Sequence, residues 1–122
     1  MHGHILVWID QRSARLFRID RDSIESAGAG PNQIVHHQNE NNTGRSNDKA
    51  FFSDIAEGLT GAHGILIVGP GEEKTSLSKW LTERCPDIAG NVWAVEPMDH
   101  PTDPQLIAHG KAYFGDQEKM RA

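Results

Sequence analysis

Hydrophobic and polar positions along the first third of the chain predict three extended segments. Residues His4–Asp10 are apolar at odd and even positions alike, which is typical of a strand buried on both faces in the middle of a sheet. After a polar break, Ala14–Ile19 resumes the extended pattern, and two strands so close in sequence pair antiparallel. A third strand is expected at Gln33–His37. The chain should therefore begin with antiparallel strands.

Helices alternate with strands in the rest of the chain. Apolar residues recur at helical spacing over 51–59, and Gly61 ends this helix. A second helix is expected over Glu72–Cys85. Two further strands are expected at Gly64–Val68 and Asn91–Glu96. This alternation is typical of an α/β fold.

A third helix and one polar segment complete these expectations. Asp103 is expected as the N-cap, with Pro104 at the first helical position. Gly115 should end this helix and leave a frayed polar tail at 116–122. Residues 38–48 carry no apolar side chain, so burial cannot order them, and we expect a mobile surface loop.

The length of 122 residues leaves room for one domain, 1–122, with a core of its own. The order of strands and helices predicts a mixed five-stranded sheet, with antiparallel strands first and the later strands parallel. Three helices should cover its two faces. This arrangement is that of a ribonuclease H-like fold.

Charge and cysteine content narrow the class of protein. The net charge of −5 and the pI near 5.7 argue against a protein that wraps nucleic acid. The single cysteine, Cys85, cannot form an internal disulfide, and no apolar run is long enough for a membrane span. We therefore expect a cytoplasmic protein without a membrane partner.

Four arginines nevertheless gather around the expected hairpin: Arg12, Arg15, Arg18 and Arg21. The favoured interpretation is that they discourage edge-to-edge pairing of the sheet. A phosphate-contacting patch is the alternative interpretation.

The most distinctive segment is Gly64–Leu77, in which an apolar strand turns through Gly-Pro-Gly into a helix that carries Lys74. This segment resembles the middle domain of class-1 peptide release factors and of Pelota. The whole chain is similar to a group of stand-alone bacterial translational machinery proteins. That similarity rests on four motifs: Trp8-Ile9-Asp10, His36-His37, Gly69-Pro70 and Asp99-His100-Pro101.

The chain departs from release factors in the segment where they carry a Gly-Gly-Gln tip. The only glycine of residues 38–48 is Gly44, and Arg45 follows it. Peptide-release chemistry therefore does not carry over. The resemblance implies a non-catalytic protein that has no cofactor. This protein would bind the ribosome or a translation factor, and the contact could include RNA. The expected contact residues are Arg45, Lys74, Arg12 and Arg15.

Two other classes of function remain open. A metal-dependent hydrolase or nuclease of ribonuclease H-like fold would use Asp10 with Asp99 and His100, because such enzymes need converging metal ligands. Asp10 is more simply a turn former, and His100 more simply holds its loop. The other class is a homo-oligomeric interaction module. The sequence leaves the oligomeric state open and allows a homodimer.

The spacing of the histidines along the sequence is only weak evidence for a metal site. His36 and His37 are adjacent on an expected strand, so they point to opposite faces. His2 and His4 share a face, but at the chain terminus. We therefore expect no metal site from spacing alone.

Overall fold

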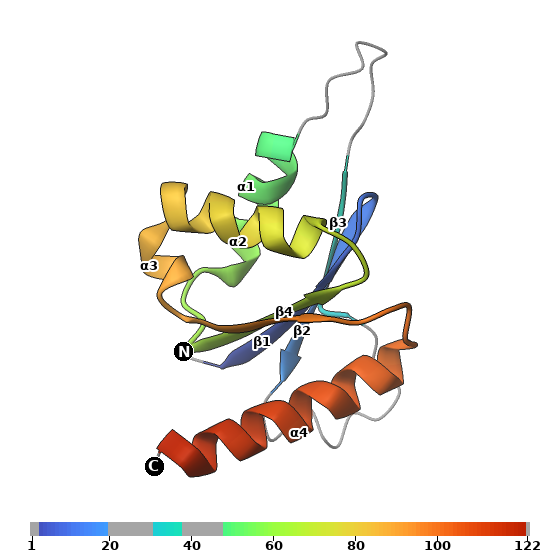
Figure 1. Cartoon of the computed structure of the whole chain (residues 1–122), viewed down its shortest axis with the longest axis vertical. Helices are drawn as coiled ribbons and strands as arrows, with labels where there is room; N and C mark the ends of the chain where they lie inside the picture. Colours follow the sequence, from blue (N-terminus) through green and yellow to red (C-terminus); the bar gives the residue numbers. More distant parts are fainter. Residues whose placement is uncertain (1–2, 20–30, 38–47, 122) are drawn as a thin grey trace.

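The computed structural model describes residues 3–19, 31–37 and 48–121 (Figure 1). The strands are β1 (His4–Ile9), β2 (Ser13–Ile19), β3 (Gln33–His36), β4 (Gly64–Gly69) and β5 (Val92–Pro97). The helices are α1 (Asp48–Leu59), α2 (Glu73–Arg84), α3 (Pro86–Ala89) and α4 (Asp103–Arg121). The loop expected at 38–48 lies outside the described residues except for its last residue, which begins α1.

The strands form one mixed sheet in the order β3-β2-β1-β4-β5. β1 pairs antiparallel with β2, and β2 pairs antiparallel with β3. β1 pairs parallel with β4, and β4 pairs parallel with β5. The predicted fold class, a single α/β domain with antiparallel strands first and parallel strands later, is confirmed.

β1 lies at the centre of the sheet because both of its faces are apolar. Ile5, Val7 and Ile9 belong to a buried cluster with residues of α1 and α2. Leu6 and Trp8 point to the other face and join a second cluster with residues of α4. Figure 1 shows α1, α2 and α3 on one side of the sheet and α4 on the other. Helices therefore cover both faces, as the element order predicts.

Three helix boundaries differ from the sequence prediction. Pro86 does not simply stop α2: one further helical turn, α3, begins at this proline, which suits the first turn of a helix because that position needs no N–H donor. The described part of the chain therefore has four helices where three were expected.

The second difference is that α4 continues through Gly115 to Arg121, so 116–121 is helical where a frayed tail was expected. A glycine inside a helix costs only about 1 kcal/mol relative to alanine. Contacts on either side of it outweigh this cost: Phe114 is buried before Gly115, and Glu118 bonds to His4 after it.

The start of α4 also differs from the prediction that Asp103 is the N-cap. Thr102 and Gln105 bond reciprocally: the Thr102 amide donates to Gln105 Oε1 over 2.9 Å, and the Gln105 amide donates to Thr102 Oγ1 over 3.3 Å. This is a capping box with Thr102 as the N-cap. Asp103 is instead the first helical residue, and its carboxylate pairs with Arg15.

None of the helices in the described ranges combines the length and the apolar character that crossing a membrane requires.

Candidate functional site

An open hollow lies where β1 and β4 end side by side. The β1–β2 turn and the β4–α2 turn form it, and its volume is about 290 Å³. Its lining residues are Asp10, Gln11, Arg12, Pro70, Gly71 and Glu73. In open α/β sheets, ligands and partners usually bind at the carboxyl ends of the strands. This edge is therefore the first candidate site.

Gly69 allows the two strands to approach each other at this edge. A Cβ on Gly69 would lie 2.2 Å from the carbonyl oxygen of Ile9, far inside a normal contact. The Gly69 carbonyl also accepts a hydrogen bond from the Met98 amide over 2.9 Å. The glycine thus brings the β1–β2 turn, the β4–α2 turn and the end of β5 together.

Asp10 shapes the β1–β2 turn. Its Oδ1 accepts hydrogen bonds from the amides of Arg12, over 2.8 Å, and Ser13, over 2.9 Å. This is the side-chain pattern of an Asx turn. It agrees with the interpretation of Asp10 as a turn former.

Arg15 and Trp8 connect the hairpin to the start of α4. The Arg15 guanidinium carbon lies 4.6 Å from the centre of the Trp8 ring, and the guanidinium pairs with the Asp103 carboxylate. Trp8 Nε1 donates to the Asp99 carbonyl over 2.9 Å. Arg15 is therefore engaged within the fold, with its side chain 22% exposed.

The other three expected contact residues have different surroundings. The Arg12 side chain is exposed at the hollow. Lys74 Nζ donates to the Gly71 carbonyl over 2.5 Å, at the first turn of α2 beside the hollow. Arg45 lies outside the described residues.

Asp10, Asp99 and His100 are not brought together as a metal site. His100 Nδ1 lies 3.3 Å from Asp99 Oδ1, and both side chains are largely exposed. Among the residues that the structure describes, three or more His, Cys, Asp or Glu donor atoms lie within 4.8 Å of one another in only one group: His4, His63 and Glu118. The geometry therefore does not favour the hydrolase or nuclease alternative.

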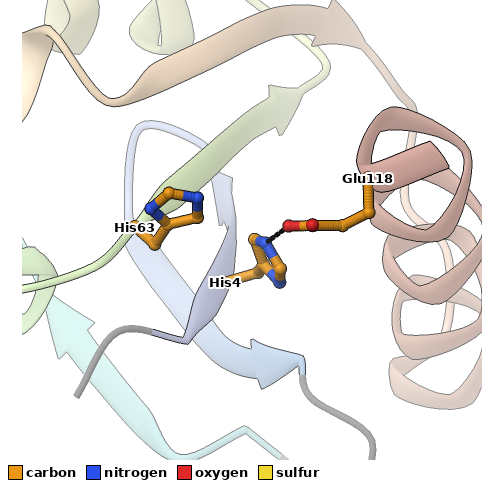
Figure 2. A group of neighbouring side chains, drawn as sticks. All are labelled: His4, His63 and Glu118. Carbon is orange, nitrogen blue, oxygen red and sulfur yellow. Dashed lines mark hydrogen bonds and ion pairs between the residues drawn. The ribbon is translucent and has the colours of Figure 1, made fainter. Parts of the chain in front are cut away.

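His4, His63 and Glu118 meet at the opposite end of the parallel strands (Figure 2). His4 begins β1, His63 directly precedes β4, and Glu118 lies near the end of α4. The parallel register, in which His4 faces Gly64, brings the first two side by side. Sequence spacing considered His4 only with His2, which lies outside the described residues.

Comparison with known proteins bears mainly on the fold. No protein-family model and no curated protein sequence matches the chain. Among solved structures, it is similar to Pelota from Archaeoglobus fulgidus, with a TM-score of 0.67 and 16% sequence identity. The match covers 98% of this chain and 35% of the Pelota chain, whose structure is described as revealing inter-domain structural plasticity. The expected Pelota-like α/β fold is thereby confirmed, over a chain that spans about a third of the length of that protein.

Proposed function

We propose that this protein is a non-catalytic, cytoplasmic component of the translation apparatus that binds the ribosome or a translation factor. The observation that carries the proposal is the likeness to Pelota over 98% of the chain. Translation is the process that the resemblance to Pelota and to release-factor middle domains implies. The further resemblance to stand-alone bacterial translational machinery proteins stays a prediction.

The proposed contact surface is the edge at which β1 and β4 end. Arg12 is exposed at the hollow, and Lys74 lies beside it at the start of α2, bonded to Gly71 of the hollow's lining. Arg45 joins them in the proposal from the sequence alone. Arg15 supports this surface indirectly, because its contacts with Trp8 and Asp103 hold the hairpin against α4.

The charges at this surface are mixed. Asp10 and Glu73 line the same hollow as Arg12. Carboxylates at this position would repel a phosphate that entered the hollow, so phosphate contacts are confined to its rim. The proposed partner surface is therefore one that offers both charges, such as a ribosomal protein beside exposed RNA.

Co-sedimentation of the untagged protein with ribosomes over a salt series tests this proposal. The charge-reversal variant R12E/K74E should lose most of its retention, because two cations at the contact become anions. The control K79E/K119E makes the same change in net charge at two exposed lysines on α2 and α4. It should bind like the unchanged protein.

The salt dependence separates an RNA contact from a protein contact. If both cations contact phosphates, neutralising them as R12Q/K74Q should reduce the salt slope of log affinity by about 2. R45E, measured separately, tests the residue outside the described ranges. Equal retention of R12E/K74E and its control would refute the surface. Absence from every ribosomal fraction at low salt would refute ribosome binding and leave a translation factor as the proposed partner.

A further inference from the structure

Three potential metal ligands converge at the amino ends of β1 and β4, away from the proposed contact surface. His4 Nε2 lies 2.7 Å from Glu118 Oε2, and His63 completes a group whose donor atoms all lie within 4.8 Å of one another (Figure 2). The three residues are far apart in sequence and come from a strand, a loop and a helix. Only the fold brings them together.

The His4 ring is held in place by its neighbours. It stacks on Phe114 with the ring centres 4.5 Å apart and the planes 20° apart. Trp93 approaches it edge-on at 5.3 Å. A Cβ on Gly64 would lie 2.8 Å from the Trp93 ring and 3.0 Å from His4 Cδ2, so this glycine leaves room for both rings. The imidazole is therefore fixed before any ligand binds.

His63 and Glu118 complete the group from the solvent side. Both residues are exposed, and the Glu118 side chain is 50% exposed. The His63 amide donates to the Gly3 carbonyl over 2.9 Å, which anchors its backbone beside the start of β1. A bound ion would thus have one rigid ligand, two adjustable ligands and a coordination position open to water.

The donor set selects the class of ion. Two imidazole nitrogens with one carboxylate suit divalent transition metals and not calcium or magnesium, which prefer oxygen ligands. Zinc sites with two histidines, one glutamate and an open position are well established. The geometry points to a zinc-type divalent ion bound by His4, His63 and Glu118.

The distances fit this ion after small side-chain movements. Four ligands at about 2.0–2.1 Å around a tetrahedral zinc ion lie about 3.3 Å from one another. His4 Nε2 and Glu118 Oε2, now at 2.7 Å, must separate slightly, and His63 must approach from within 4.8 Å. Rotation of the exposed His63 and Glu118 side chains supplies both movements.

Metal binding here would join α4 to the sheet. The last turns of α4 follow Gly115, beyond the buried contacts of Phe114. The ion would add bonds from these turns to β1 and to the loop before β4. We therefore expect the ion to stabilise the fold as well as to bind.

The chain contains a matched comparison for this group. His109 Nε2 lies 3.1 Å from Glu96 Oε1, so it also forms a histidine–carboxylate pair on the surface. This pair is not part of any three-donor group within the described ranges. Loss of His109 removes a surface imidazole without touching the proposed site.

Calorimetric titration of the untagged, chelator-stripped protein with zinc chloride tests the assignment. We expect one strong site per chain. Because each variant removes one of three ligands, H63A and E118Q should weaken binding about 100-fold or more. E118Q keeps the length of the side chain, and H109A should bind as the unchanged protein does.

Thermal unfolding gives a second readout. With zinc at about 100 times its dissociation constant, the midpoint should rise by roughly 10 °C for a domain of this size. The rise should disappear in H63A and persist in H109A, while the midpoints in chelator should show that both variants fold. Absence of strong zinc binding, or equal binding by H63A, E118Q and the unchanged protein, would overturn the proposal.

Discussion

Replacement of Gly69 by alanine tests how closely β1 and β4 approach at the candidate site. The added methyl group would lie 2.2 Å from the Ile9 carbonyl oxygen and 3.3 Å from the Ile9 carbonyl carbon. Both atoms belong to the backbone of the central strand, so no side-chain rotation relieves the clash. The two strand ends would have to separate by roughly 1 Å to restore an ordinary contact.

The cost of this movement follows from its surroundings. Overpacking a well-packed interior costs about 1–3 kcal/mol. We expect the upper end, about 3 kcal/mol, because Ile9 is fully buried and the Gly69 carbonyl is bonded to Met98. With about 2.1 cal/mol/K of unfolding entropy per residue, the midpoint of thermal unfolding should fall by roughly 12 °C.

Urea unfolding followed by tryptophan fluorescence, with thermal unfolding followed by circular dichroism, measures both quantities. Gly71→Ala is the matched control in the same turn, because its Cβ would meet no atom of the described residues within 4 Å. Both substitutions lower the entropy of the unfolded chain equally. The difference between their free energies of unfolding therefore measures the cost of the clash alone. If Gly69→Ala is as stable as Gly71→Ala, the close approach of the two strands is refuted.

Three further predictions concern two glycines and one ion pair. Gly115→Ala should raise the free energy of unfolding by about 1 kcal/mol, because the Cβ would extend into space free of described atoms inside a helix. Gly61→Ala should lower the free energy of unfolding by about 1–2 kcal/mol, because φ is 85° at this position and alanine is strained there. Equal effects of the two glycine substitutions in urea unfolding would contradict both predictions. A double-mutant cycle on Arg15 and Asp103, each changed to alanine, should give a coupling of about 1 kcal/mol that declines with salt. A coupling of zero at low salt would show that this pair does not join the hairpin to α4.

Local pattern was sufficient for most of the fold because the signals were strong and independent. A strand that is apolar on both faces has to be central, and β1 is. A short polar break between extended segments leaves only a hairpin, which β1 and β2 form. Gly61 ends α1 with a positive φ, as glycine after a helix commonly does.

The two ends of α4 were predicted wrongly because a weak local signal was given too much weight at each. Gly115 carries a small helix penalty that distant contacts overcome, and the contact of Glu118 with His4 is invisible in local sequence. The capping box was visible in principle: Thr102 and Gln105 have the required spacing. The Asp103-Pro104 pair drew the prediction one residue too far.

The candidate sites depended on register, which local sequence does not contain. The hollow at the carboxyl ends could be expected from the parallel arrangement. Arg12 lines it, and Lys74 bonds to Gly71 of its lining. The meeting of His4 with His63 requires the pairing of β1 with β4 to be known residue by residue. Glu118 joins these two histidines only because α4 continues past Gly115, which the sequence analysis did not predict.

The position of α4 has a consequence for synthesis of the chain on the ribosome. Within the described ranges, α4 is the only helix on its face of the sheet, where it packs over Leu6, Trp8 and Phe17. At about 5–20 residues per second, the roughly one hundred residues between β1 and α4 take about 5–20 s to translate. During that interval a nascent hairpin would present these apolar side chains to solvent. Apolar surface that is exposed in this way is prone to aggregation. The helix that completes the fold therefore also ends that exposure.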